Sequence, residues 1–213
     1  MSIPSLVVGI LGAESTGKST LAQQLAAEMQ SRGASAAVVP EVLREFCLAH
    51  GRTPLVHEQR AIAKEQSRRI EPARQQHSVV VADTTALLTA VYSEYIFQDL
   101  SLYEDALVDH RWVDLTLLTA LDLPWIEDGI QRDGAHVREP VDALIRAALT
   151  KGRLSHTVVS GQGANRLESA LAAVDHALLV AQASRSGAPR RPWRWICEKC
   201  DDGDCEQHWL PQG

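Results

Sequence analysis

The feature that most constrains this chain is a glycine-rich segment after a short apolar run. Residues 12–19 read Gly-Ala-Glu-Ser-Thr-Gly-Lys-Ser, a complete G-x-x-x-x-G-K-S pattern. The apolar run Leu6–Leu11 precedes it, and Leu21, Leu25 and Met29 recur behind it at helical spacing. Backbone N–H groups between a strand and a helix N-terminus attract an anion, and glycines let them close around it. The pattern therefore predicts a phosphate-binding loop.

The other apolar runs predict the fold around this loop. Short runs alternate with longer helical patterns, which is typical of a mostly parallel sheet in an α/β fold. We expect a doubly wound sheet with strands at Leu6–Leu11, Ser35–Val39, Val79–Ala82, Leu115–Thr119 and Thr157–Ser160. We expect further helices at Glu58–Gln76 with a bend at Pro72, at Thr84–Phe97, at Val141–Thr150 and from Asn165 onward.

Composition and charge exclude several classes of protein. The chain has 213 residues, with 21 Lys and Arg against 27 Asp and Glu, which gives a formal net charge of −6. This acidic balance disfavours a protein that coats nucleic acid. No apolar run approaches the roughly 20 residues that cross a bilayer, and the first residues lack the basic start of a signal peptide. We therefore expect a cytoplasmic protein with no membrane segment.

The glycine-rich segment has expected roles at a nucleoside triphosphate. Lys18 is expected to bridge β- and γ-phosphate oxygens, and Ser19 to ligate Mg²⁺. A plain strand-to-helix turn is the weaker alternative, given the strand before and the helix after. A phosphate loop does not reveal where the γ-phosphate goes. The expected nucleotide-binding residues are Gly12, Glu14, Ser15, Thr16, Gly17, Lys18, Ser19 and Thr20.

Two carboxylates follow predicted strands, where ligands gather in a parallel sheet. Asp83 comes after the third strand and is expected to hold Mg²⁺ across from Ser19. Its structural alternative is a helix N-cap. Glu41 comes after the second strand and is expected to accept a proton from a substrate hydroxyl. Its alternative is a solvated carboxylate in the first turn of a helix.

The segment after the fourth predicted strand mixes acids, an arginine and two glycines, which is typical of a mobile lid. It runs over residues 122–134. Arg132 and Arg138 are candidate cations that close over a transferring phosphoryl group, and a surface charge is the alternative for each. Trp125 is a candidate for stacking on an aromatic base, with plain packing as its alternative.

Together these motifs resemble the ribosylnicotinamide kinase domain of the bacterial NadR-type proteins, a P-loop kinase group. The resemblance covers roughly residues 6–180 and rests on residues 12–21, 41–46, 58–66, 83–85 and 117–132. It implies ATP, Mg²⁺ and transfer to the 5′-hydroxyl of nicotinamide riboside, which gives nicotinamide mononucleotide in NAD biosynthesis. The expected catalytic residues are Lys18, Glu41, Asp83 and Arg132. The expected acceptor-binding residues are Glu41, Arg44, Trp125 and Asp128.

The identity of the acceptor stays open within this resemblance. Another nucleoside or a nucleotide is the close alternative, and a regulatory or nucleic-acid-associated ATPase is an alternative from another class. The adenylyltransferase half of the NadR-type proteins is not expected here. Only eleven residues precede Gly12, and no two of the eight histidines have the spacing of an H-x-G-H motif.

The composition changes near the C-terminus. Residues 184–192 are polar and rich in proline, which predicts a linker between a kinase domain at 1–183 and a tail at 193–213. The tail spells C-x2-C-x4-C-x2-H. Three thiolates and one imidazole complete a tetrahedral set with no open position, so the spacing predicts a structural Zn²⁺. The four expected ligands are Cys197, Cys200, Cys205 and His208.

Two other interpretations of the tail stay open. It could be unliganded, or it could contact nucleic acid through the arginines and tryptophans that precede the cysteines. Five acidic residues between Glu198 and Glu206 oppose the second interpretation.

Overall fold

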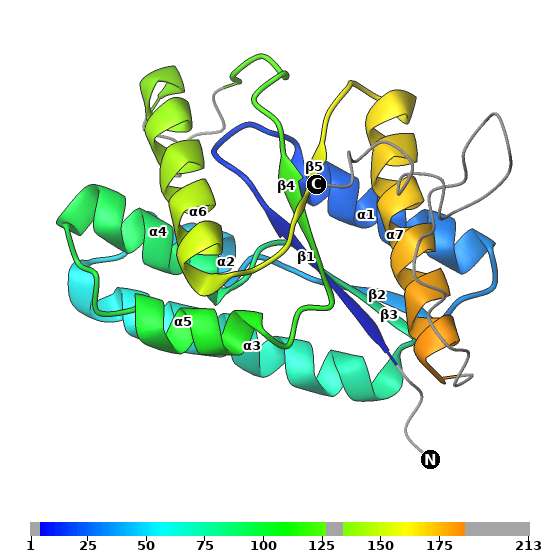
Figure 1. Ribbon diagram of the computed structural model, residues 1–213. Coiled ribbons are helices and arrows are strands. Elements are labelled where there is room, and N and C mark those ends of the chain that lie inside the picture. The colour runs from blue at the N-terminus through cyan, green and yellow to red at the C-terminus, as the bar shows by residue number, and fades with distance from the viewer. Residues whose placement is uncertain (1–4, 127–133, 186–213) are drawn as a thin grey trace, which may run out of the picture. The chain divides into compact units, whose positions relative to one another are not determined.

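A five-stranded parallel sheet in the order β2-β3-β1-β4-β5 forms the centre of the fold (Figure 1). The computed structural model describes residues 5–126 and 134–185. The chain divides into two compact units, Met1–Leu179 and Val180–Gly213, and the sheet belongs to the first. The strands are β1 Leu6–Leu11, β2 Ala36–Val39, β3 Val79–Ala82, β4 Leu115–Thr119 and β5 Thr157–Val159.

Helices connect the strands and cover the sheet. Among residues 5–126 and 134–185, none of them combines the length and hydropathy needed to cross a membrane. The elements are α1 Lys18–Ser31, α2 Val42–His50, α3 Val56–Gln76, α4 Ala86–Phe97, α5 Tyr103–His110, the 3₁₀ turn η1 Ala135–Val137, α6 Arg138–Gly152 and α7 Ala164–Arg185.

Strand β1 lies in the middle of the sheet and is buried along its whole length. It pairs with β3 on one side and with β4 on the other. Val8 and Ile10 pack with α1 and α7, whereas Leu11 packs with α4, α5 and α6 on the opposite face (Figure 1). Because both faces are covered, the strand is a continuous apolar run. Its carboxyl end therefore delivers the glycine-rich segment to the edge where the neighbouring strands also end.

Most of the predicted elements are present with small changes at their ends. Strands β1, β3 and β4 have the predicted bounds, and β2 and β5 are each one residue shorter. Helix α3 begins earlier than predicted, at Val56, and continues through Pro72 to Gln76. Helix α4 begins later than predicted, because Thr85 takes an extended N-cap conformation. Helices α2 and α5 were not predicted.

Candidate active site

The glycine-rich segment forms the turn between β1 and α1. Gly17 is the N-cap of α1 and has a left-handed backbone with φ 76°, which favours glycine. At Gly12 the limit is space, because an added Cβ would lie 1.9 Å from Thr119 Oγ1. A side chain at either position would distort the turn. The backbone of this turn therefore requires both glycines of the pattern.

Two buried threonines hold this loop against the sheet. Thr16 Oγ1 donates a hydrogen bond to the Ala13 carbonyl oxygen at 2.8 Å. Thr119 Oγ1, at the end of β4, donates to Thr16 Oγ1 at 2.7 Å. Thr119 was missed by the sequence analysis. Two signals were available: Thr119 lies at the carboxyl end of a predicted strand, and it belongs to the segment 117–132 on which the resemblance rests.

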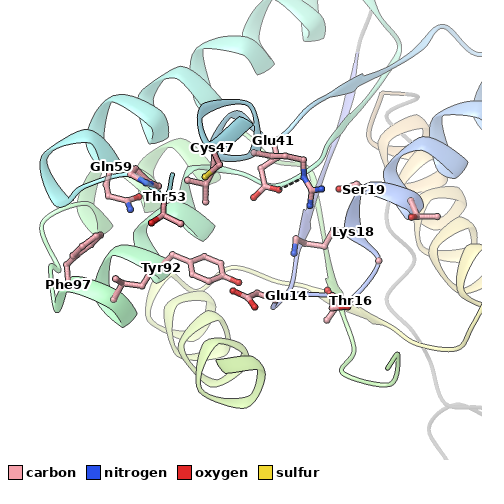
Figure 2. A pocket seen from close by; sticks show the side chains of 17 residues that line it. Glu14, Thr16, Lys18, Ser19, Glu41, Cys47, Thr53, Gln59, Tyr92 and Phe97 are labelled. Carbon is pink, nitrogen blue, oxygen red and sulfur yellow. Dashed lines mark ion pairs between the residues drawn. The ribbon is translucent and has the colours of Figure 1, made fainter. Parts of the chain in front are cut away.

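A cavity of about 210 Å³ lies beside the phosphate loop and is lined by residues of the loop, α1, α2, α4 and the start of α3. Figure 2 shows Glu14, Lys18 and Glu41 on the side of the loop, and Thr53, Gln59 and Phe97 on the other. Charged side chains therefore line the part of the cavity next to the loop. Uncharged side chains line the opposite part, which we call the uncharged compartment.

Lys18 is the cation that the phosphate loop contributes to this cavity. Its Nζ donates to the Ala13 carbonyl oxygen at 2.9 Å, so the ammonium group lies over the loop. Burial lowers the pKa of Lys18, whereas the charges of Glu41 and Asp83 act to raise it. The structure thus brings Lys18 and both predicted carboxylates into one electrostatic cluster.

Glu41 is the residue before α2 and lines the cavity. Its carboxylate lies 3.6 Å from Arg44 Nε, and its side chain is 10% exposed. Burial raises the pKa of Glu41, which the charge of Lys18 opposes. The solvated carboxylate that was the alternative does not fit this environment. A raised pKa makes the carboxylate a stronger base near neutral pH.

Asp83 follows β3 and is 5% exposed. Within the described part of the chain, its Oδ1 is buried and has no hydrogen-bond partner. The next residue, Thr84, has φ 86°, an outlier for a β-branched side chain of the kind that clusters at functional sites. Asp83 does not line the cavity itself, whereas Ser19 does. A buried carboxylate oxygen with a vacant lone pair and a serine hydroxyl fit Mg²⁺ as hard oxygen ligands.

The other predicted site residues differ in whether they line the cavity and whether they lie in the described part of the chain. Arg44 lines the cavity, and Trp125 does not. Trp125 is half-buried, and its Nε1 has no hydrogen-bond partner among the described residues. Six predicted residues lie outside the described part of the chain: Asp128, Arg132, Cys197, Cys200, Cys205 and His208.

Arg138 begins α6, directly after η1, and is 9% exposed. Its Nε and Nη2 atoms are buried and have no hydrogen-bond partner among residues 5–126 and 134–185. A buried guanidinium carries a large desolvation cost unless an anion accompanies it. This arginine therefore has the properties of an anion-binding residue.

The residues after β4 contact the phosphate loop and the loop before α7. The Ile126 N–H donates to Ser15 Oγ at 2.8 Å. The Asp122 carboxylate accepts a hydrogen bond from the Gly161 N–H at 2.6 Å and forms an ion pair with Arg166. This segment thus joins two loops at the carboxyl edge of the sheet.

Comparison with known proteins identifies the fold. The AAA domain family matches residues 7–166, and no curated protein sequence matches the chain. A crystal structure of NadR protein in complex with NR is 23% identical with TM-score 0.69, over 81% of this chain and 51% of that one. NadR protein in complex with NAD and AMP-PNP is 23% identical with TM-score 0.65, over 81% and 49%.

A smaller kinase has a similar fold. Thymidylate kinase from Ehrlichia chaffeensis is 16% identical with TM-score 0.54, over 75% of this chain and 88% of that one. The chain spans about half the length of the two NadR chains. The predicted fold class is confirmed: a parallel sheet with flanking helices in the P-loop kinase arrangement.

Proposed function

The chain belongs to the AAA domain family. We propose that it is an ATP-dependent kinase for a small acceptor of the nucleoside class. Nicotinamide riboside is the first candidate, because the motifs resemble the NadR-type kinase domain and NadR protein in complex with NR has a similar fold. One observation carries the proposal. A buried carboxylate, Glu41, lines the same cavity as the phosphate-loop lysine, Lys18.

The phosphate loop would hold the donor. The N-terminus of α1 and the backbone N–H groups of the loop favour the β-phosphate, and the Lys18 ammonium compensates negative charge on the β- and γ-oxygens. Ser19 and Asp83 are the residues that would hold Mg²⁺. When bound, this ion would supply further positive charge at the transferring phosphoryl group.

Glu41 would act on the acceptor. The acceptor 5′-oxygen forms a bond to the γ-phosphorus while the bond from that phosphorus to the β–γ bridging oxygen breaks, and ADP leaves. The hydroxyl proton passes to a Glu41 carboxylate oxygen. Burial keeps this carboxylate poorly solvated and raises its pKa, which strengthens it as a base.

Arginines of the segment around residues 127–138 would complete the charge compensation. Arg138 is buried with two nitrogen atoms that lack partners in the described part of the chain, and this supports an anion nearby. Arg132 keeps the same expected role by its sequence position. Guanidinium groups suit the oxygens of a transferring phosphoryl group because they donate several hydrogen bonds in a fixed geometry.

We also propose that the tail binds one structural Zn²⁺ through Cys197, Cys200, Cys205 and His208. This proposal rests on their spacing alone. It is independent of phosphoryl transfer, because four protein ligands leave zinc no open position.

The test of the kinase proposal is ADP release measured with Mg·ATP and a panel of acceptors. We expect release that requires an added nucleoside, with nicotinamide riboside as the best substrate, and the phosphorylated product in equal amount by mass spectrometry. Hydrolysis that needs no acceptor and is stimulated by DNA or RNA would contradict the proposal and favour a nucleic-acid-associated ATPase.

A further inference from the structure

Helix α3 carries two buried glutamines on one face, Gln59 and Gln66. They are 2% and 1% exposed, and their spacing of seven residues places them on the same side of the helix. A buried carboxamide normally has its hydrogen bonds satisfied, because leaving them unmade is costly. The two side chains differ in this respect.

Gln66 is satisfied by the protein. Its Oε1 accepts a hydrogen bond from the Val42 N–H at 2.8 Å, and its Nε2 donates to the Pro40 carbonyl oxygen at 3.3 Å. These contacts join α3 to the turn between β2 and α2, which also carries Glu41. The role of Gln66 is therefore structural.

Gln59 lines the cavity instead, and among the described residues its Oε1 is buried without a hydrogen-bond partner. Figure 2 shows it on the side of the cavity away from Lys18, together with Thr53 and Phe97. The side chains that line the cavity beyond the loop, Glu41 and Arg44 are uncharged: Leu43, Cys47, Thr53, Pro54, Gln59, Tyr92, Ile96 and Phe97.

We propose that Gln59 is the specificity residue for the ring of the acceptor, and that this ring carries adjacent hydrogen-bond donor and acceptor groups. The inference rests on the proposed function. If the 5′-hydroxyl lies at Glu41, the ring of a riboside extends away from Lys18 towards Gln59. A carboxamide both donates and accepts, so it pairs with a ring carboxamide or with the edge of a base, as Gln does with adenine.

The other lining residues define this ring further. Tyr92 and Phe97 offer aromatic surfaces that suit a planar ring. Among the residues that the structure describes, no cation lines this compartment, so it favours an uncharged ring over a ring that carries a phosphate. A riboside that lacks the hydrogen-bonding edge leaves Gln59 buried and unpaired, which is the condition under which enzymes discriminate strongly.

The experiment compares matched ribosides in steady-state kinetics. The pairs are nicotinamide riboside with pyridine riboside, and adenosine with purine riboside, where the second member lacks the carboxamide or the amino group. The variants are Gln59→Met, which keeps the length of the side chain, and Gln59→Leu. Gln66→Leu is the matched control, because it removes a buried carboxamide from the same helix face.

For the preferred pair we expect wild-type protein to favour the riboside that carries the carboxamide or amino group by about 10- to 100-fold in kcat/KM, the effect of one unsatisfied buried hydrogen-bonding group. Both Gln59 variants should lose this preference, mainly through a higher KM for the riboside that carries the carboxamide or amino group. Gln66→Leu should lower the unfolding temperature and keep the preference.

The outcomes separate the two proposals. A preference that is unchanged in Gln59→Met and Gln59→Leu overturns the role of Gln59 and leaves the kinase proposal intact. Binding of the same ribosides is also measured by calorimetry without ATP. A protein that binds them with a Gln59-dependent preference but transfers no phosphate retains this inference and loses the kinase proposal. A protein that neither binds nor phosphorylates any of the ribosides overturns both.

Discussion

Burial acts on Lys18 and Glu41 in opposite directions. It lowers the pKa of the ammonium group and raises that of the carboxyl group, while each charge partly offsets the effect on the other. Both groups are therefore less solvated than they would be on the surface. Phosphate oxygens at the loop would stabilise the charged form of Lys18, and a substrate hydroxyl would meet a carboxylate that readily takes a proton.

The first prediction concerns Lys18→Ala. Loss of the ammonium group should reduce ADP release by about 10²- to 10³-fold, because charge on the β- and γ-oxygens is no longer compensated. The unfolding temperature by circular dichroism should stay close to that of wild type. Lys64→Ala, which changes an exposed lysine on α3, is the control. If Lys18→Ala releases ADP at the wild-type rate, the phosphate loop does not have the role proposed for it.

The second prediction concerns the pH dependence of Glu41. A base acts in its unprotonated form, and the pKa of Glu41 is raised above its usual 4.5. As the pH is lowered, Glu41 should therefore become protonated, and kcat/KM should begin to fall, while the pH is still above 4.5. Glu41→Gln should reduce kcat/KM by roughly 10²-fold or more at neutral pH and abolish this acid limb.

Asp83→Asn provides the contrast for this prediction. It should keep the acid limb and raise the Mg²⁺ concentration that gives half-maximal activity, because a metal ligand is weakened while the base remains. The measurement is kcat/KM against pH and against Mg²⁺ for both variants. An acid limb that persists in Glu41→Gln would exclude this residue as the base.

The two kinds of site residue differ in how far the sequence reveals them. Lys18 and Ser19 belong to a contiguous motif, and Glu41 and Asp83 follow strands that could be recognised by their apolar runs. Gln59 lies inside a polar helix, and its role depends on which face α4 and α2 cover. Gln59 belongs to the segment 58–66 on which the resemblance rests, but its place at the cavity is tertiary information that the sequence does not supply.

At the scale of elements, Asp122 and Arg166 link the end of β4 to the loop before α7. The Arg166 side chain is 6% exposed, and it also donates to the Gly161 carbonyl oxygen at 2.9 Å. Burial lowers the pKa of Arg166, and Asp122 opposes this effect. Asp122 thus compensates a charge that the fold has largely removed from water.

The third prediction concerns Asp122→Asn. Removing the carboxylate charge leaves a buried guanidinium without its partner, so the free energy of unfolding should fall by about 2 kcal/mol. Urea denaturation measures this change. Asp175→Asn is the control, because the Arg32 and Asp175 side chains are 40% and 50% exposed and should contribute less than about 1 kcal/mol. Equal effects of the two substitutions would contradict the role assigned to Asp122.

Element length explains which helices the sequence predicts. Helices α1 and α3 have 14 and 21 residues, enough for apolar or polar positions to recur over several turns. Helices α2 and α5 have nine and eight residues, so the helical period is hardly sampled. The strands were easier to predict, because parallel strands covered on both faces are short apolar runs with clear ends.

At the scale of the whole molecule, His110 couples stability to pH. It is 2% exposed, and its two ring nitrogens lie 2.9 Å from Thr85 Oγ1 and 2.9 Å from Thr116 Oγ1. Burial lowers the pKa of His110 from 6.5 to about 4. Between these values the unfolded chain binds more protons than the folded one, so stability decreases as the pH falls through this window.

The fourth prediction follows from this difference. His110→Gln should destabilise the protein at pH 8, and the destabilisation relative to wild type should shrink by up to about 3 kcal/mol as the pH falls to about 4. Urea denaturation over this pH range measures it. His156→Gln, which changes an exposed histidine, should show a difference that does not vary in this way. A constant difference for His110→Gln would refute the coupling.

The fifth prediction concerns the tail, whose ligands lie outside the described residues. Metal analysis of protein purified without chelator should find about one zinc per chain, and Cys200→Ser should lose it. A chain that ends at residue 192 should retain most of the kinase activity, because the metal supports the folding of the tail only. Zinc retained in Cys200→Ser would exclude this ligand set.

The central position of β1 has a consequence for how the chain acquires its shape during translation. Strand β1 leaves the ribosome before both of its neighbours: β2 and three helices are made before β3, and two more helices are made before β4. The backbone N–H and C=O groups along its two edges stay unpaired until both neighbours emerge, and such non-local pairing is slow and exposed to aggregation. Of the five strands of this sheet, the one that carries the phosphate loop is thus made first and is enclosed only after two later strands, so expression yield should depend on chaperones more than native stability would suggest.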